Sequence, residues 1–370
     1  MDAASFSQAC AERIRRVQHE LLRQGLRGAL ISDPANLFYL SGHLISEGNA
    51  TALLVVPVDG SSTLVIHEDE KELQSVQQFS GTILTYIQQD SESALLAASR
   101  CFRDTYSDSL HPLGIESYSL PVQCAAEMDL ETGGDWKDIQ GIMVRFRTYK
   151  DDDEIKRLRT AASVADAGQR AARELFKRGI SEIELLSGCR AAMEKTAGRP
   201  IGFLADVLIG EKTALIGSPD GVAGELCAAS SDPAIVDILP QVGGYFADTT
   251  RTLWSGKAPA DRRGVVQLLQ EVKRDLEKLL RPGVQAIEID GPARERLNKE
   301  GSFPHHTGHG IGISHYEAPF VRQDSRDVLE AGMVITLEPG LYYDDWGARI
   351  EDDYLITPDG FEKLTRSEGG

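Results

Sequence analysis

Apolar and polar positions alternate in two different ways along the first part of the chain. Helical spacing of apolar residues predicts a helix at about 8–24. Short apolar runs with the length of buried strands follow at 28–32, 52–57, 63–66 and 82–87. Helix and strand patterns mixed in this way predict an α/β (α+β) domain over residues 1–147.

The later part, residues 148–370, contains a weak internal repeat. Sliding the chain along itself by 104 residues places Gly179–Ser181 on Gly283–Gln285. In each half the pattern predicts a long helix (about 154–178 and 261–281), a second helix (about 182–196 and 286–299) and then strands. We therefore expect a duplicated ααβ domain with pseudo-twofold symmetry.

Polar residues predict where two of these helices begin. Ser181 and Glu184 have the spacing of a capping box, which places the start of the second helix of the first half. The acidic run Asp151–Glu154 suits the N-terminus of the preceding long helix, because the helix dipole favours negative charge there. The stretch Glu131–Trp136, which precedes it, is rich in turn formers.

Acidic side chains stand where apolar strand patterns would bury them. A buried carboxylate without a compensating cation or donor costs several kcal/mol, so each such position needs an explanation. Asp237 lies within an apolar run, and Asp248 follows after a Gly-Gly pair that favours a hairpin. Glu338 ends a second run, and Glu351 lies on the next predicted strand. Each half of the repeat thus has a carboxylate on each of two neighbouring strands.

Histidines gather between these two pairs of carboxylates. Four of the chain's eight histidines lie within eleven residues, separated by small or apolar side chains: His305, His306, His309 and His315. Four carboxylates carry about the charge that two divalent cations would balance, and oxygen-rich ligation with one imidazole favours Mn, Co, Fe or Zn over Cu. Paired ions of this kind activate water for hydrolysis.

Five short segments, taken in order, carry a family resemblance. V-D-I, A-D-T-T-R-T, H-H-T-G-H-G-I-G, L-E-P-G and R-I-E-D resemble the metal-site motifs of the prolidase, aminopeptidase P, methionine aminopeptidase and creatinase superfamily, which has the pita-bread fold. The resemblance implies two divalent metal ions, Mn foremost and Co, Zn or Fe otherwise. It implies Glu351 as a bridging ligand, His309 as the only nitrogen ligand and Glu338 as a proton shuttle. The implied ligands are Asp237, Asp248, His309, Glu338 and Glu351.

The first part of the chain resembles the same superfamily. Residues 33–42, D-P-A-N-L-F-Y-L-S-G, resemble the creatinase/prolidase N-terminal domain, and Lys150–Arg157 resembles the segment that opens the catalytic domain. Methionine aminopeptidase lacks the first domain and is a poor match. The resemblance implies an N-terminal domain at 1–147, a pita-bread catalytic domain at 148–370, and a homodimer.

Departures from the family pattern concern the substrate. Gly217 stands where the family's peptidases usually have a histidine, and Tyr316 stands where a second histidine is usual, with His315 one residue earlier. On a strand this exchange points His315 to the opposite face, and Tyr316 would supply a phenolic donor instead. His305 matches a family histidine that hydrogen-bonds the tetrahedral intermediate or the scissile amide.

Other polar residues near the motifs have more than one interpretation. Arg349 either orients the ligand carboxylates or the substrate carboxylate through bidentate hydrogen bonds, or forms a structural salt bridge. We interpret Arg251 as structural and His306 as a solvent-facing or packing side chain. The candidate catalytic residues are His305, Glu338, Tyr316, His315 and Arg349.

The composition removes several classes of function. A net charge of −18 without a Lys/Arg block makes a nucleic-acid partner unexpected. Neither a stretch of roughly 20 apolar residues nor a signal-peptide core occurs, so we expect a cytoplasmic protein without a membrane partner. Five scattered cysteines without a C-x-x-C pair predict buried free thiols. The absence of a G-x-S-x-G elbow argues against covalent catalysis.

These observations lead to one main hypothesis and two alternatives. The main hypothesis is a dinuclear metallohydrolase that cleaves Xaa-Pro dipeptides or short Xaa-Pro peptides, as a cytosolic prolidase or Xaa-Pro aminopeptidase does. The first alternative keeps the site but takes a small non-proline amide or a cyclic amidine, as an ectoine hydrolase does, and rests on Gly217 and Tyr316. The second is a non-catalytic binding protein on the same fold.

Overall fold

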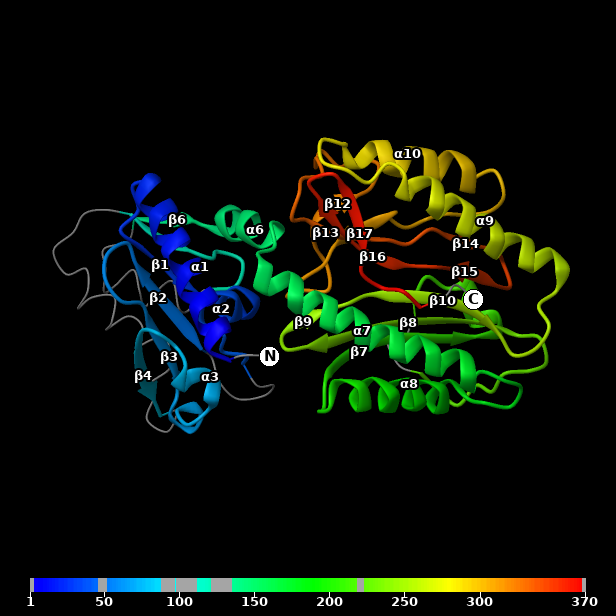
Figure 1. Cartoon of the computed structure of the whole chain (residues 1–370), viewed down its shortest axis with the longest axis horizontal. Coiled ribbons are helices and arrows are strands. Elements are labelled where there is room, and N and C mark those ends of the chain that lie inside the picture. The colour runs from blue at the N-terminus through cyan, green and yellow to red at the C-terminus, as the bar shows by residue number, and fades with distance from the viewer. Residues whose placement is uncertain are drawn as a thin grey trace. The chain divides into compact units, whose positions relative to one another are not determined.

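The chain divides into two compact units, Met1–Arg147 and Thr148–Gly370, and each is described by itself (Figure 1). The computed structural model describes residues 3–45, 52–87, 97, 112–120, 135–217 and 223–367. Most of the turn-rich stretch expected at 131–136 lies outside these ranges, as do Cys101 and Cys124. Of the cysteines within them, Cys10 and Cys189 are buried as expected, whereas Cys227 is exposed, so that expectation is wrong for Cys227.

The first unit is built on a six-stranded sheet with the order β4-β3-β2-β1-β5-β6. The β1–β2 and β2–β3 pairs are antiparallel and the other three pairs are parallel. All four strands expected from the apolar runs are present. The strands are β1 (Gly28–Ile31), β2 (Leu53–Pro57), β3 (Thr63–His67), β4 (Thr82–Tyr86), β5 (Leu113–Ile115) and β6 (Trp136–Asp138).

Helices of the first unit begin and end at residues with clear local reasons. The segment D-P-A-N-L-F-Y-L-S-G forms a capped helix, in which the Asp33 carboxylate accepts the Asn36 N–H at 2.9 Å and Gly42 ends it at φ +75°. The expected N-terminal helix starts five residues earlier than its pattern indicated. The helices are α1 (Ala3–Arg23), α2 (Pro34–Ser41), α3 (Gln74–Gln77) and α6 (Gln140–Thr148), with a 3-10 turn at Glu68–Glu70.

The second unit contains the duplicated helix pairs expected from the repeat. Its helices are α7 (Asp152–Leu175), α8 (Glu182–Ala197), α9 (Ala260–Glu277) and α10 (Ala286–Leu297). Helices α8 and α10 start 104 residues apart, and both begin with a capping box. The turn before each is also repeated: Gly179 and Gly283 both have φ +88°, which favours glycine, and both donate their N–H groups to a later segment.

Two sheets and a short hairpin accompany these helices. The first sheet has the order β10-β8-β7, with β9 paired to β8, and contains β7 (Gly202–Ile209), β8 (Pro233–Val242), β9 (Tyr245–Phe246) and β10 (Thr249–Trp254). The second has the order β12-β11-β13-β16-β17 and contains β11 (Gly308–Gly310), β12 (Glu317–Val321), β13 (Val334–Leu337), β16 (Asp352–Thr357) and β17 (Gly360–Lys363). Strands β14 (Gly340–Tyr342) and β15 (Gly347–Arg349) form the hairpin, and a 3-10 helix, η3, spans Gly210–Ala214.

The helices pack on the strands from two sides. Helix α7 contacts β8 and α8 contacts β7, whereas α9 contacts β14 and β15 and α10 contacts β12 (Figure 1). Leu269, Val272 and Leu276 of α9 are buried at helical spacing in the core that also includes Ile335 and Leu337 of β13. Full burial of one such side chain contributes about 1.5–3 kcal/mol. This core therefore fixes the strand end that precedes Glu338, and the α/β fold class is confirmed.

Candidate metal centre and active site

The five expected ligands come from five neighbouring backbone segments. Asp237 lies within β8 and His309 at the middle of β11, whereas the other three stand directly beside a strand end. The backbone N–H groups of these three residues form hydrogen bonds outside the ladders of those strands. Asp248 donates to Asp353 Oδ2 at 3.0 Å, Glu338 to the Thr307 carbonyl at 2.9 Å and Glu351 to the Thr250 carbonyl at 2.9 Å. The last bond connects β10 of the first half to the ligand segment of the second.

The His309 imidazole lies at the centre of the cluster. Its Nε2 atom is 3.7 Å from Asp248 Oδ2, 3.6 Å from Glu338 Oε1 and 3.9 Å from Glu351 Oε1. One nitrogen or oxygen atom from each of Asp248, His309 and Glu351 lies within 4.8 Å of the others. Asp237 faces Thr250 across the β8–β10 ladder, and Thr250 Oγ1 donates to Glu351 Oε2 at 2.8 Å. All five expected ligands therefore come together.

The carboxylates are buried and repel one another. Burial raises the pKa of Asp248 well above its ordinary value, and the negative charges of Glu351 and Asp237 raise it further. Burial also raises the pKa of Glu351, with Glu338 and Asp237 adding to it. One buried oxygen of each of Asp237, Asp248 and Glu351 has no hydrogen-bond partner. Unpartnered carboxylate oxygens among like charges are the surroundings that divalent cations fit.

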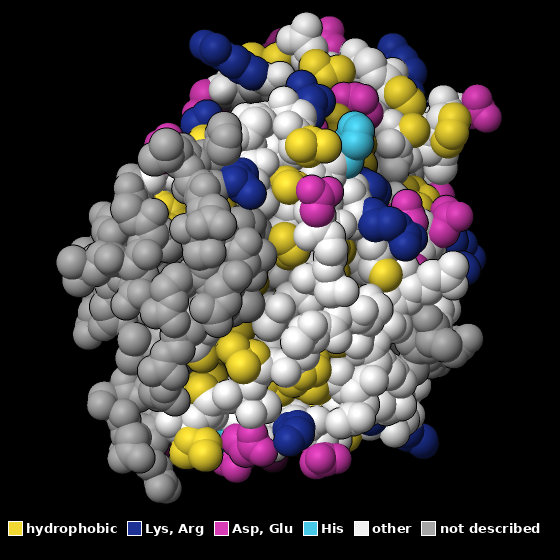
Figure 2. Space-filling model, turned by 90° about the vertical axis from the view of Figure 1, so that its left-hand side faces the viewer, with side chains coloured by type: hydrophobic (Ala, Val, Ile, Leu, Met, Phe, Trp, Pro, Cys, Tyr) yellow, Lys and Arg dark blue, Asp and Glu magenta, His cyan; other side chains and the backbone are white. Residues whose placement is uncertain are grey.

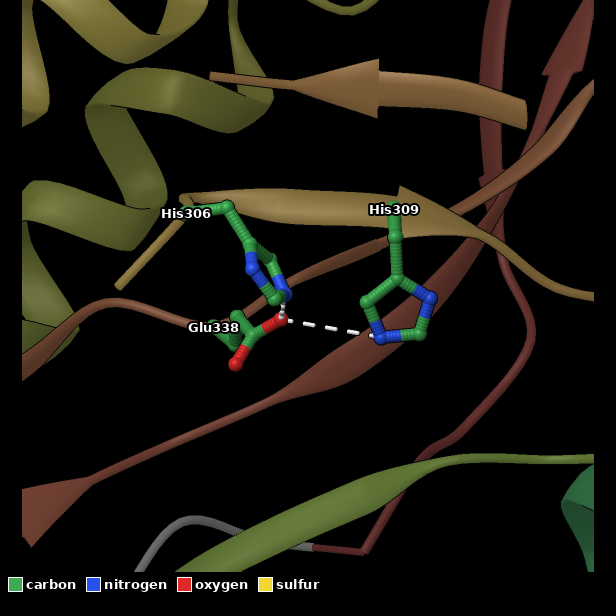
Figure 3. Close-up of side chains that lie close together, drawn as sticks. All are labelled: His306, His309 and Glu338. Atoms are coloured by element: carbon green, nitrogen blue, oxygen red, sulfur yellow. Dashed lines mark ion pairs between the residues drawn. The ribbon is translucent and has the colours of Figure 1, made fainter. Parts of the chain in front are cut away.

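Glu338 differs from the other carboxylates because histidines surround it. Burial disfavours its charged form, but the hydrogen bond from His306 and the nearby His305 and His309 hold its pKa at about 2. Glu338 Oε1 is 2.6 Å from His306 Nε2, and Glu338 Oε2 is 3.6 Å from His305 Nδ1. The expectation that His306 faces solvent or merely packs is wrong, because the strand-like segment before β11 aims its ring at Glu338 (Figure 3).

Arg349 links Asp237 to a second group of polar side chains. Its Nη2 donates to Asp237 Oδ2 at 2.7 Å, and its Nη1 donates to the Tyr342 hydroxyl at 2.8 Å and the Ile216 carbonyl at 2.7 Å. The Tyr342 hydroxyl is also 3.0 Å from His305 Nε2. Arg349 thus pairs with one candidate ligand carboxylate, a contact that both of its interpretations contain. Sequence reasoning missed Tyr342; its position in an apolar strand, where a hydroxyl needs a partner, was the available signal.

Residues His315 and Tyr316 do not lie on a strand, so the argument from alternating faces is wrong. The β11–β12 ladder shifts register between His309 and Gly310, and the chain bends until β12 starts at Glu317. A turn hydrogen bond from Gly312 N–H to the Ser314 carbonyl shapes this bend. The Tyr316 ring lies 4.8 Å from the His309 ring, and the His315 ring lies 5.7 Å from the Phe246 ring, both measured between centroids.

Gly217 lies close to an acidic side chain that the sequence had not drawn attention to. A Cβ atom at residue 217 would lie 3.1 Å from Asp206 Oδ2. Asp206 of β7 stands directly opposite Asp237 in the β7–β8 ladder. The negative charge of Asp206 also raises the pKa of Asp237, after burial, which is the largest cause. The Asp206 carboxylate therefore lies next to residue 217, the position that we align with a histidine of the family's peptidases.

A buried charge cluster supports the segment that contains Glu351. Arg251 donates to the Glu351 carbonyl and, at 2.6 Å, to Asp352 Oδ1, as its structural interpretation requires. Lys273 and Lys363 pair with the other Asp352 oxygen. Burial alone would raise the pKa of Asp352, but the nearby cations outweigh this effect and hold the pKa well below its usual range. Three cations around one carboxylate fix the backbone next to Glu351.

Two observations concern membrane-spanning helices and the molecular surface. No helix among the described residues is long and apolar enough to cross a membrane. On the face drawn in Figure 2, the described side chains include acidic and basic groups near one another, with apolar groups between them.

Comparisons with known proteins match both units. The model of metallopeptidase family M24 matches residues 156–358, and that of the creatinase/prolidase N-terminal domain matches residues 13–149. An uncharacterized peptidase of Staphylococcus aureus (strain USA300) is 29% identical over 363 residues, which cover 96% of this chain and 99% of the relative.

Two similar crystal structures have informative names. The prolidase from Pyrococcus horikoshii OT3 has a TM-score of 0.85 at 26% identity and covers 97% of this chain and 99% of its own. The Xaa-Pro dipeptidase from Bacillus anthracis also has a TM-score of 0.85 at 26% identity, covering 98% of this chain and 99% of its own.

Proposed function

This chain belongs to metallopeptidase family M24, and from that premise we propose that it is a dinuclear metal-dependent hydrolase of Xaa-Pro dipeptides or short Xaa-Pro peptides. The observation that carries the proposal is the convergence of the buried Asp248, Glu338 and Glu351 carboxylates on the His309 imidazole. One buried oxygen of each of Asp237, Asp248 and Glu351 also lacks a hydrogen-bond partner. The similar prolidase and Xaa-Pro dipeptidase structures support the choice of substrate.

The proposed ligands are Asp237, Asp248, His309, Glu338 and Glu351, with Mn the first choice and Co, Zn or Fe the others. When bound, the two ions supply Lewis acidity that activates water and polarises the scissile carbonyl. Glu351 stands between the two halves of the site and is the proposed bridging ligand, since Thr250 of the first half holds its Oε2.

The protein's own side chains supply proton handling and orientation. Glu338 is the proposed proton shuttle: its carboxylate takes a proton from the attacking water and returns it to the leaving amine. His305 is the proposed hydrogen-bond partner of the reacting amide. Its Nε2 contacts the Tyr342 hydroxyl at 3.0 Å and its Nδ1 the His306 carbonyl at 2.8 Å, so one of these contacts would be exchanged when the substrate binds. Arg349 orients Asp237. His315 and Tyr316 remain candidates at the margin of the site, with Tyr316 as a phenolic donor.

One observation favours a second substrate class. The Asp206 carboxylate lies beside Gly217, and its negative charge would favour a positively charged substrate group where an imidazole would not. A small non-proline amide or a cyclic amidine, as taken by ectoine hydrolases, is therefore the alternative. The non-catalytic binding protein has no comparable support, because all five ligand residues are present and brought together.

The first experiment is a substrate panel with Mn-loaded protein: Xaa-Pro dipeptides, longer Xaa-Pro peptides, non-proline amides and a cyclic amidine. Turnover of Xaa-Pro dipeptides that is lost in Asp248→Ala supports the proposal. If the metal-loaded protein hydrolyses the amidine but none of the Xaa-Pro substrates, the alternative replaces the proposal. We also propose that the protein is a cytoplasmic homodimer. Light scattering of the purified protein tests the oligomeric state.

A further inference from the structure

We propose that His306 is a sixth ligand of the metal centre and gives the ion held by His309 and Glu338 a second imidazole. The consequence is that the site of this one ion has a higher affinity for Zn²⁺ or Co²⁺, relative to Mn²⁺, than it would have with His309 as its single imidazole. This inference rests on the proposed metal centre and adds to it a residue that the family resemblance leaves unassigned.

The first argument is the geometry of three side-chain atoms. One ring nitrogen of His306, one of His309 and one oxygen of Glu338 lie within 4.8 Å of one another. Glu338 Oε1 is 2.6 Å from His306 Nε2 and 3.6 Å from His309 Nε2. The 3.6 Å separation suits two ligand atoms that each lie about 2.0–2.2 Å from one ion, whereas the 2.6 Å contact is a hydrogen-bond distance, which would lengthen to about 3 Å when the ion replaces the shared proton. Figure 3 shows both imidazoles directed toward the same carboxylate oxygen.

The second argument is that the backbone on both sides of His306 is fixed. The preceding carbonyl, that of His305, accepts a hydrogen bond from Arg294 Nη2 at 2.6 Å, and Arg294 is itself paired with Asp290. The following residue, Thr307, donates its N–H to the Val321 carbonyl at 2.9 Å and its hydroxyl to Asp290 Oδ1 at 2.7 Å. A side chain presented from such a backbone is preorganised for ligation.

The third argument is the surroundings of the ring. Its centroid lies 5.3 Å from that of His309 and 5.3 Å from that of Tyr316, whose own ring lies 4.8 Å from His309. The His306 side chain is 25% exposed, so it stands at the margin of the site on the side of Tyr316. The ring therefore has one partly open side and one nitrogen facing a ligand oxygen.

Ligand chemistry turns this geometry into a metal preference. Carboxylate and water ligands suit Mn²⁺, whereas imidazole suits Zn²⁺ and other later transition metals. A second nitrogen donor raises the affinity for Co²⁺ and Zn²⁺ more than that for Mn²⁺, following the order in which divalent ions bind such donors.

The test compares His306→Gln with His67→Gln, the loss of an imidazole on β3 of the first unit, whose side chain is 20% exposed. Equilibrium metal content is measured in competition between Mn²⁺ and Zn²⁺, and the visible absorption of Co²⁺-loaded protein is recorded. We expect His306→Gln to lower the Zn²⁺/Mn²⁺ affinity ratio by about tenfold or more and to change the Co²⁺ spectrum. His67→Gln should leave both unchanged.

X-ray absorption of the Zn²⁺-loaded wild-type protein keeps the proposal testable if the variant does not fold. The spectrum should contain twice the imidazole scattering that His309 alone would give. An unchanged affinity ratio and spectrum in His306→Gln, or scattering from His309 alone, overturns the inference and leaves His306 as a hydrogen-bond donor to Glu338. Loss of all metal binding in Asp248→Ala, tested in parallel, reports on the proposed centre independently of His306.

Discussion

Replacing Arg349 by methionine removes the guanidinium that faces the buried Asp237 carboxylate. The Arg349 side chain is 4% exposed and that of Asp237 is 13% exposed, so solvent screens the pair weakly. Removing one partner of such a pair typically costs about 3–5 kcal/mol, because the other charge stays buried without compensation. We expect the metal-free Arg349→Met protein to lose free energy of unfolding in this range.

Metal binding should reduce this loss. With ions bound, a cation again faces Asp237, and what remains is the loss of two hydrogen bonds from Arg349, to Tyr342 and to the Ile216 carbonyl. Such bonds contribute about 1 kcal/mol each, so the loss should fall to about 2 kcal/mol. The difference between the two conditions is therefore the measurable quantity.

Urea unfolding with EDTA and with saturating Mn²⁺, followed by tryptophan fluorescence, measures both values. Arg157→Met is the matched control, because the Arg157 side chain is 7% exposed and pairs with Asp153 on α7. Its loss should be the same with and without metal. Equal losses for Arg349→Met in the two conditions, or a loss below about 1 kcal/mol without metal, would refute the reasoning.

Three further predictions follow from individual groups. In EDTA, stability should fall as pH rises from about 7.5 to about 8, because burial raises the folded-state pKa values of Asp248 and Glu351 well above their ordinary values and the folded state then binds more protons than the unfolded state. Unfolded histidines, with an ordinary pKa of about 6.5, have lost most of their protons at this pH. Urea midpoints that rise over this window contradict the prediction. Tyr342→Phe should lower kcat while metal content stays at the wild-type level, since only the bridge from Arg349 to His305 is lost; elemental analysis that finds metal missing would assign Tyr342 a different role. Ser181→Ala should cost about 1 kcal/mol in the free energy of unfolding through loss of the α8 cap, and no change in thermal unfolding would show the cap to be dispensable.

The parts of the fold that the sequence predicted are those set by local chemistry. Capping boxes and positive-φ glycines mark the same turn in both halves, so the repeat appeared at the correct spacing before α8 and α10. The four strands of the first unit followed from the length of apolar runs. The four candidate carboxylates drew attention because they interrupt apolar segments, which is costly without compensation, and the structure brings three of them to His309.

The errors and omissions depend on contacts between distant segments. His306 faces Glu338 because Arg294 holds the carbonyl before it, and no local pattern contains that contact. Asp206 faces Asp237 through the register of β7 on β8, which is set by the whole ladder. The bend before β12 follows a register shift that apolar spacing does not predict.

The central claim is that five side chains from both halves of the repeat hold two divalent ions. The direct measurement is the metal content per chain of wild-type protein and of Asp248→Ala after equilibration with Mn²⁺ and removal of free metal. The account predicts two ions per wild-type chain and a clear loss in the variant, with the fold preserved by circular dichroism. Equal metal content in a folded Asp248→Ala, or none in the wild type, would contradict it.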